Sequence, residues 1–309
     1  MSNVKRPALE GTVAVRDERR LSFAEYGSRL GPAIVWMHGT PGARRQIPLE
    51  VRAYAEEKGL RIIGIDRPGI GSSTPYLYPD LLDWTADLEI LLDTLAVDTA
   101  RIIGLSGGGP YALAAGAAIP DRIHGVGVLG GLAPTHGPDA PAGGVIQLAV
   151  RLAPLLVAAR VPLGVALTVA IRLVRPLAGP GLDLYAAVQP PGDKNLLSRP
   201  EFKAMFLDDL LNGSRFQTSA PISDLVLFTR PWGFAPVDVS VPVRWWHGDE
   251  DHIVPFAHGQ HMVELLPDAA LKVIDGESHL CGLGIAREVV GTLMELGPRR
   301  SAPATRRGN

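Results

Sequence analysis

The chain has 309 residues, 46% of them hydrophobic and 20% charged, a composition typical of a globular protein with a sizeable core. A formal net charge of −2 gives no basic surface of the kind that binds nucleic acid. The single cysteine excludes an internal disulfide framework. The first ten residues are polar and predict no secretory signal, so we expect a cytoplasmic protein.

Short apolar segments alternate with helical patterns in the first 130 residues, which indicates parallel β–α–β units. The first two segments predict an antiparallel hairpin at the edge of a sheet, and the next two are apolar enough to be buried strands. The predicted strands are 12–15, 21–26, 33–37, 61–65, 101–105 and 123–129, and the predicted helices are 48–58, 80–95 and 108–119.

This alternation stops between residues 133 and 235, where helical, apolar sequence punctuated by proline replaces it. We interpret this stretch as a cap inserted above the sheet and not as a tandem domain. Its part 145–174 is strongly apolar but is interrupted by Arg151, Arg160 and Arg172. Its uncharged stretches are about half the roughly 20 residues that a membrane-spanning helix needs. We therefore expect no integral span, while weak membrane association through the apolar cap stays open.

The alternation resumes after the insertion, with predicted strands 241–246 and 271–274 and predicted helices 257–266 and 284–296. The last residues are rich in proline, arginine and glycine and predict disorder. The predicted organisation is a core made of 1–132 and 236–296, a helical cap over 133–235, and a disordered tail over 297–309.

The sequence Gly104-Leu105-Ser106-Gly107-Gly108 fits the pattern G-x-S-x-G and joins a predicted strand to a predicted helix. This strand–turn–helix setting is typical of a nucleophile elbow, in which glycines let the sharp turn pack tightly. Ser106 would lie at the start of the helix, where free N–H groups favour a developing negative charge. The alternative is a glycine-rich turn that caps a helix and carries an ordinary serine.

Two later loops, 247–252 and 275–279, carry acidic residues and histidines and each follow a predicted parallel strand. Because the carboxyl ends of parallel strands meet at one edge of the sheet, we expect these loops to approach Ser106. A nucleophilic serine needs a base and an acid that orients it, and these loops offer both.

A further loop, His38-Gly39-Thr40-Pro41-Gly42, follows the predicted strand 33–37. In this position a turn flanked by glycine can direct the N–H of Thr40 at an oxyanion, together with the N–H of Gly107. A simple Pro-Gly turn is the other interpretation, and the two are compatible.

These motifs together resemble the α/β-hydrolase superfamily, close to its esterases, proline iminopeptidases, epoxide hydrolases and cofactor-free haloperoxidases. The resemblance covers residues 12 to 296 apart from the insertion. It implies a mostly parallel eight-stranded sheet with helices on both faces and a helical cap after the sixth strand. The matching segments are 38–42, Asp66-Arg67-Pro68-Gly69-Ile70-Gly71-Ser72-Ser73, 104–108, Gly248-Asp249-Glu250-Asp251-His252-Ile253-Val254-Pro255 and Ser278-His279.

The resemblance also implies roles for individual residues. Ser106 would be the nucleophile, His279 the base and Asp251 the acid. Asp251 is preferred over Asp249 because the family places the acid three residues after the glycine, here Gly248. The remaining implied residues are Thr40 and Gly107 for the oxyanion hole and Gly39, Gly104 and Gly108 for the elbow and turns. No cofactor is expected.

A metal site is the competing interpretation of the loop that carries Asp251. Side chains of types that bind metal crowd this region, but their spacing matches no recognised metal motif, so we expect none. They are His247, Asp249, Asp251, His252, His258 and His261.

The predicted function is hydrolysis of a carboxylic ester of a small to medium hydrophobic substrate, through an acyl-enzyme. Serine at the nucleophile position counts against epoxide hydrolysis and dehalogenation, for which the family uses aspartate. A proline iminopeptidase would need cap acids to hold the substrate ammonium, and four are available: Asp183, Glu201, Asp208 and Asp209. A perhydrolase or haloperoxidase would use the same triad. A binding protein without catalysis, on a hydrolase scaffold, is the alternative from another class.

Overall fold

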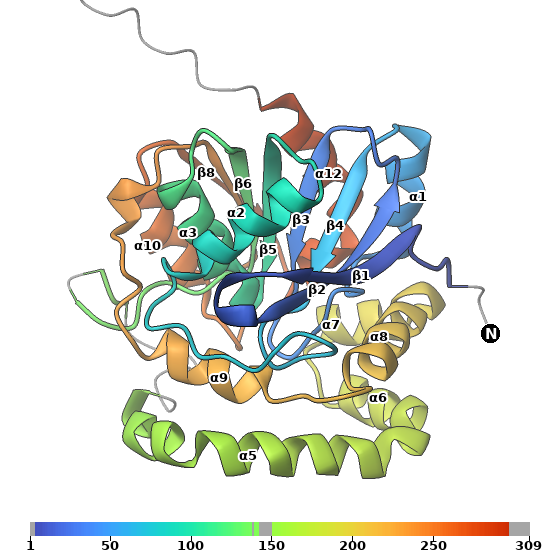
Figure 1. Ribbon diagram of the computed structural model, residues 1–309. Coiled ribbons are helices and arrows are strands. Elements are labelled where there is room, and N and C mark those ends of the chain that lie inside the picture. The colour runs from blue at the N-terminus through green and yellow to red at the C-terminus, as the bar shows by residue number, and fades with distance from the viewer. Residues whose placement is uncertain (1–3, 138, 142–149, 297–309) are drawn as a thin grey trace, which may run out of the picture.

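The computed structural model describes residues 4–137, 139–141 and 150–296. Within them, eight strands form one sheet in the order β1-β2-β4-β3-β5-β6-β7-β8 (Figure 1). The strands are β1 (Leu9–Ala14), β2 (Arg20–Gly27), β3 (Ala33–Met37), β4 (Arg61–Ile65), β5 (Ala100–Leu105), β6 (Ile123–Leu129), β7 (Val243–Gly248) and β8 (Ala269–Ile274). The predicted tail 297–309 lies outside the described residues.

The sheet is antiparallel only at one edge. β1 pairs with β2 and β2 pairs with β4 in antiparallel register, whereas the pairs from β4 through β8 are parallel. Every residue of β3 and β4 is buried, as expected for strands covered on both faces. The predicted mixed sheet with an edge hairpin is therefore confirmed.

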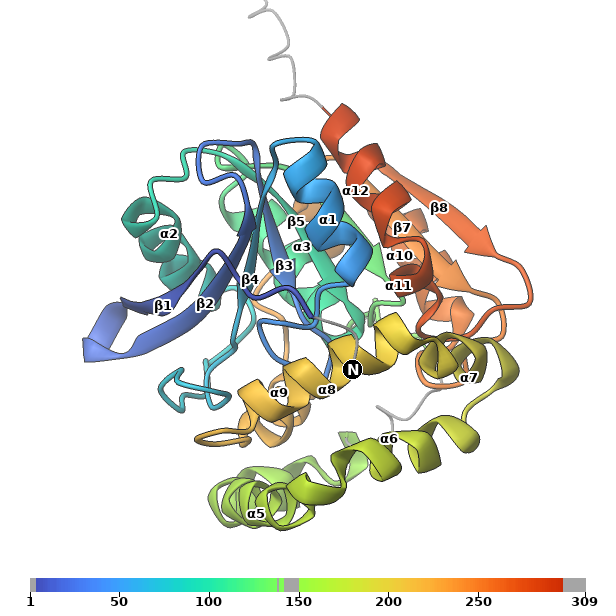
Figure 2. The ribbon, with the colours of Figure 1, turned by 90° about the vertical axis from the view of Figure 1, so that its right-hand side faces the viewer.

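Helices cover both faces of the sheet (Figure 2). Side chains of α2, α3 and α10 share one hydrophobic core, and side chains of α1 and α12 belong to a second core on the other face. The helices of this part are α1 (Leu49–Glu57), α2 (Trp84–Thr94), α3 (Gly109–Ala118), α10 (Phe256–Leu265), α11 (Cys281–Gly284) and α12 (Ala286–Glu295).

Helix α2 begins four residues later than the apolar pattern predicts. The predicted helix starts at Asp80, but the helix in the structure starts at Trp84. The side chain of Asp80 accepts a hydrogen bond from the backbone N–H of Asp83, at 2.9 Å. Aspartate side chains compete for backbone donors in this way, which favours a turn over a further helical turn.

The helices between β6 and β7 lie together beyond the carboxyl ends of the parallel strands (Figures 1 and 2). A helical cap inserted after the sixth strand is thus confirmed. The cap helices whose bounds the structure describes are α5 (Ala153–Val174), α6 (Ala178–Ala187), α7 (Pro191–Ser198), α8 (Pro200–Gly213) and α9 (Ala220–Phe228).

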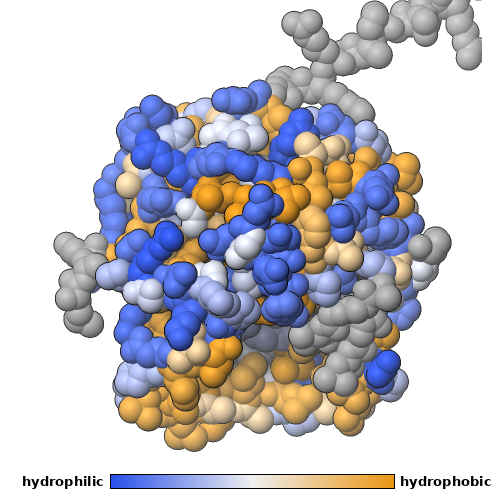
Figure 3. Space-filling view, turned by 180° about the vertical axis from the view of Figure 1, so that it is seen from behind, coloured by the Kyte–Doolittle hydropathy of each residue, from blue (hydrophilic) through white to orange (hydrophobic). Residues whose placement is uncertain are grey.

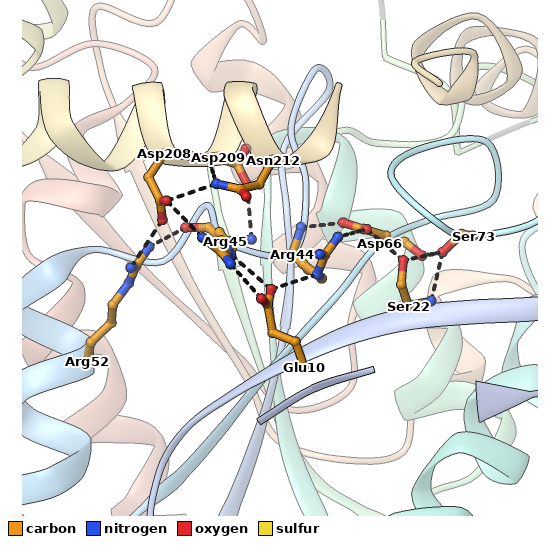
Figure 4. Close-up of polar contacts among 10 residues, drawn as sticks. All are labelled: Glu10, Ser22, Arg44, Arg45, Arg52, Asp66, Ser73, Asp208, Asp209 and Asn212. Carbon is orange, nitrogen blue, oxygen red and sulfur yellow. Dashed lines mark hydrogen bonds and ion pairs between the residues drawn. The ribbon is translucent and has the colours of Figure 1, made fainter. Parts of the chain in front are cut away.

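A polar cluster fastens α8 to the core (Figure 4). Arg45, in the loop after β3, donates to Asp208 of α8 at 2.9 Å and to Glu10 of β1 at 2.9 Å. Asp209 accepts the backbone N–H groups of Ala43 and Arg45, at 2.9 and 3.0 Å. These bonds hold α8 against the loop after β3, because it is costly to leave polar groups such as buried Asp209 unpaired.

Asp209 makes the stability of this contact dependent on pH. Burial raises the pKa of Asp209 to about 7, and the neighbouring carboxylate of Asp66 acts in the same direction. Since the folded pKa lies above the unfolded value of about 4, its stabilising contribution is full below about pH 4 and is lost as pH rises through 7.

In the wild type, we expect the free energy of unfolding to fall between about pH 5 and about pH 8 as Asp209 ionises. In Asp209→Asn this fall should be smaller by up to about 2 kcal/mol. Denaturant unfolding at a series of pH values measures this difference. Asp121→Asn, at an exposed carboxylate, is the control. Equal pH dependence in wild type and Asp209→Asn would contradict the raised pKa.

Candidate active site

Ser106 lies in a tight turn between β5 and α3. Its φ of 51° is in the left-handed region, which is uncommon for a residue with a side chain and is held by the surrounding packing. A β-carbon at Gly104 would lie 2.4 Å from the carbonyl oxygen of Gly108. A β-carbon at Gly108 would lie 2.3 Å from the carbonyl oxygen of Met37. Gly104 therefore lets the turn close on itself, and Gly108 lets it pack against β3.

Ser106, His279 and Asp251 form a continuous chain of hydrogen bonds. The Nε2 of His279 lies 2.8 Å from the Oγ of Ser106, and its Nδ1 lies 2.7 Å from the Oδ2 of Asp251. The three side chains follow the carboxyl ends of β5, β7 and β8, so the parallel sheet itself brings them together. Asp249 is elsewhere: its side chain accepts the N–H of Gly276 on the exposed side of the loop.

Asp251 is held in its ionised form. Burial alone would raise the pKa of this carboxyl, but hydrogen bonds from His247 and His279 hold the pKa well below its usual value. Its Oδ1 also accepts the backbone N–H groups of Ile253 and Val254, each at 2.9 Å. An ionised Asp251 keeps the proton of His279 on Nδ1, which leaves Nε2 free to accept the proton of Ser106.

His247 is a second histidine on Asp251. The indole N–H of Trp245 donates to its Nδ1 at 3.2 Å, so its own proton lies on Nε2. From there it donates to Asp251, at 3.1 Å, and to the carbonyl of Val254, at 2.9 Å. Sequence reasoning placed His247 only in a possible metal cluster. Strand alternation, which puts residues 245 and 247 on one face of β7, was the available signal.

The described part of the chain does not contain the cluster of ligands that a metal site would need. No group of three or more histidine, cysteine, aspartate or glutamate side chains is placed there to hold an ion. His252 is exposed, whereas His247 is buried and bonded as described above.

Thr40 and Gly107 lie side by side next to the serine turn. A β-carbon at Gly107 would meet the hydroxyl of Thr40 at 2.4 Å, so a side chain there would displace this hydroxyl. The loop that carries Thr40 is shaped by the N–H of Gly39, which donates to the side chain of Gln46 at 2.6 Å, and by a cis peptide bond before Pro41.

A buried ion pair between core and cap holds Thr40. Arg67, after β4, donates to Asp224 of α9 through Nε, at 3.0 Å, and through Nη2, at 2.7 Å. The hydroxyl of Thr40 donates to the same carboxylate at 2.8 Å, and that of Tyr111 does so at 2.9 Å. Arg67 also donates to the carbonyl of Gly39, at 2.9 Å. The turn expected to bind an oxyanion is thus fixed by a residue of the cap.

A second cap residue reaches the histidine loop. The buried carboxylate of Asp193, in α7, accepts the backbone N–H of Leu280 at 2.8 Å, immediately after His279. Burial raises the pKa of Asp193. Sequence reasoning assigned no role to Asp193, Asp224 or Arg67, although Arg67 lies in a quoted motif. Partners 157 positions apart, such as Arg67 and Asp224, leave no local signal.

Comparison with known proteins agrees with this geometry. Residues 32–283 match the family model described as alpha/beta hydrolase fold, and the chain belongs to this family. It is 30% identical over 135 residues to the proline iminopeptidase of Neisseria meningitidis serogroup A, which is 43% of each chain. It is 34% identical over 113 residues to that of Xanthomonas citri, or 35% of each chain. The matches thus span less than half the length of these relatives.

Solved structures of the same fold cover nearly the whole chain. The esterase RhEst1 from Rhodococcus sp. ECU1013 superimposes with a TM-score of 0.65 at 21% identity, over 93% of this chain and 99% of that one. The bromoperoxidase from Bacillus anthracis gives a TM-score of 0.66 at 20% identity, over 93% and 99%. At this level of identity the similarity establishes the fold alone.

We expect Asp224→Ala to lower the free energy of unfolding by about 3 to 5 kcal/mol, because it leaves Arg67 buried without its counter-charge. Asp183→Ala, the control, breaks an exposed ion pair with Lys203 in the same cap and should cost about 1 kcal/mol or less. Denaturant unfolding of both variants measures the difference. Equal losses would show that the Arg67–Asp224 pair contributes no more than a surface pair.

Proposed function

We propose that this α/β-hydrolase cleaves carboxylic esters of small to medium hydrophobic substrates, with Ser106 as nucleophile. The observation that carries the proposal is the hydrogen-bonded chain from Ser106 through His279 to Asp251. Serine, histidine and aspartate bonded in this order are the arrangement expected of a serine hydrolase, whose catalytic groups are identified by their geometry.

In the first half of the proposed reaction, His279 Nε2 takes the proton of Ser106 as its Oγ attacks the ester carbonyl. The resulting oxyanion accepts hydrogen bonds from the N–H groups of Thr40 and Gly107. When the carbon–oxygen bond of the leaving alcohol breaks, His279 returns the proton to that alcohol. Asp251 stays ionised throughout and stabilises the imidazolium.

In the second half, water attacks the acyl-enzyme. His279 takes a proton from the water, and a second tetrahedral intermediate forms in the same oxyanion site. Its collapse breaks the bond to Ser106, returns the proton to the Oγ, and releases the carboxylic acid. Because the cap fixes Thr40 through Asp224, the oxyanion site is organised before the substrate arrives.

We expect Ser106→Ala to lower kcat/KM for p-nitrophenyl esters by at least about a thousandfold, because the acyl-enzyme can no longer form. Release of p-nitrophenol across a series of acyl lengths measures this and also sizes the pocket. Ser198→Ala, at an exposed serine of α7, should retain wild-type turnover. Full activity in Ser106→Ala would refute the assignment of the nucleophile.

Proline iminopeptidase activity is the second candidate, favoured by the partial similarity to the Neisseria and Xanthomonas enzymes. It needs a carboxylate near Ser106 to bind the substrate ammonium. The contacts of the four cap acids count against it, and the two cap carboxylates beside the site, Asp193 and Asp224, are buried and bonded to Leu280 and Arg67. Asp183 pairs with Lys203 on the surface, Asp208 pairs with Arg45, Asp209 accepts backbone N–H groups of the β3 loop, and Glu201 is exposed.

We therefore expect kcat/KM for p-nitrophenyl butyrate to exceed that for L-proline p-nitroanilide by at least about a hundredfold. Parallel assays of one enzyme preparation give this ratio. The reverse ratio would replace the esterase by the iminopeptidase. Peracid formation from acetate and hydrogen peroxide, without ester turnover, would indicate a perhydrolase, and no turnover in any of these assays would favour a binding protein.

A further inference from the structure

Helix α5 exposes large apolar side chains to solvent. Large hydrophobic side chains are exposed along its outer face, and hydrophobic residues predominate along the lower edge of the molecule, where the cap lies (Figure 3). Leu155 is 63% exposed and Leu173 is 75% exposed. We call this surface the α5 face, and its main residues are Leu155, Val161, Val165, Val169, Leu173 and Leu177.

The side of α5 that faces the protein is less exposed and mixed in character: Leu156 packs against the core, and Gly164 and Thr168 lie further along it. Gly164 is buried, and a β-carbon there would lie 2.7 Å from Ser219, just before α9. The hydroxyl of Thr168 accepts the backbone N–H of Thr218 at 3.0 Å, and Arg175 donates to the carbonyl of Leu211 in α8. Helix α5 is therefore apolar on its outer side as well, where a helix on a water-soluble surface is polar.

The charge carried by α5 and the sequence around it has a single sign. From residue 140 to residue 182 the sequence contains no aspartate, glutamate or lysine, and its charged side chains are four arginines. They are Arg151, Arg160, Arg172 and Arg175. Arginines beside an exposed apolar face complement the surface of an anionic lipid membrane, where apolar burial and attraction to headgroups add.

A groove beside α5 is lined by two of these arginines. It has a volume of about 450 Å³ and lies between α5 and residues 216–223. Arg160 and Arg172 line it alongside Val161 and Val165, and its described lining contains no carboxylate. Each guanidinium group, at the edge of an apolar surface, suits the phosphate of a lipid headgroup, which arginine binds in a planar, two-pronged geometry.

We propose that the α5 face docks on the surface of an anionic phospholipid membrane, with α5 lying along the interface. The stretch Ala153–Ala187 is long and apolar enough to cross a bilayer by length and composition. Leu156 near the start of α5 packs against the core, and the contacts of Thr168 and Arg175 hold its later part against the cap, so its outer face is the side available to lipid.

Charge argues against a second copy of the chain as the occupant of the α5 face. Two such faces in contact would bring the arginines of both copies together, and the stretch from 140 to 182 offers them no carboxylate. Like charges brought together without partners oppose association. An anionic lipid surface supplies the missing counter-charge.

Flotation of the full chain with vesicles tests this docking. We expect binding to vesicles of phosphatidylglycerol and phosphatidylcholine, weaker binding at high salt, and little binding to phosphatidylcholine alone. The double variant Leu155→Gln, Leu173→Gln should lower the partition coefficient by at least about tenfold, because it removes two exposed apolar anchors. Glutamine is a good helix former, so α5 should persist.

The matched control is the double variant Leu30→Gln, Val237→Gln, at residues 99% and 66% exposed that precede β3 and β7, at the edge of the sheet opposite the cap. It should bind vesicles as the wild type does, and circular dichroism should show all three proteins folded. Wild-type protein that floats with neither kind of vesicle, or that binds vesicles with and without phosphatidylglycerol equally, would overturn the proposal. A dimer that forms without lipid and that Leu155→Gln, Leu173→Gln dissociates would also overturn the proposal. None of these readouts requires catalysis.

Discussion

The site depends on one close contact between backbones, at the turn that carries Ser106. β5 can pass directly into α3 beside β3 only because Gly104 and Gly108 have no side chain to collide with neighbouring carbonyls. This approach puts Ser106 in a strained conformation at the carboxyl edge of the parallel strands. The loops after β7 and β8 end at the same edge, so Asp251 and His279 meet the serine without further adjustment of the sheet.

The cap takes part in the geometry of the site as well as covering it. Asp224 of α9 holds the hydroxyl of Thr40 and neutralises Arg67, while Asp193 of α7 holds the backbone beside His279. Both carboxylates are buried, so withdrawing either one would leave a polar partner unpaired at a substantial cost. The position of the cap and the shape of the candidate oxyanion site are therefore coupled, which suits a reaction that depends on groups oriented in advance.

The two sides of the cap serve different environments. Its inner side is bound to the core by ion pairs and backbone hydrogen bonds, including the cluster around Arg45 and Asp208. Its outer side, along α5, is apolar and flanked by arginines. A hydrophobic ester and an anionic membrane surface fit together, because apolar substrates concentrate where such a face would dock. The proposed chemistry and the proposed docking nevertheless rest on separate residues.

The sequence by itself determined the order of strands and helices, the serine turn, and which loops approach it. These features follow from local patterns, namely apolar period, glycine position and the rule that parallel strands end at one edge. Only the tertiary structure decided that His247 shares Asp251 with His279 and that Arg67 meets Asp224. It alone showed that large apolar side chains of α5 face outward. Periodicity tells which residues share a face of a helix, but the partner against which the helix packs decides which face is covered.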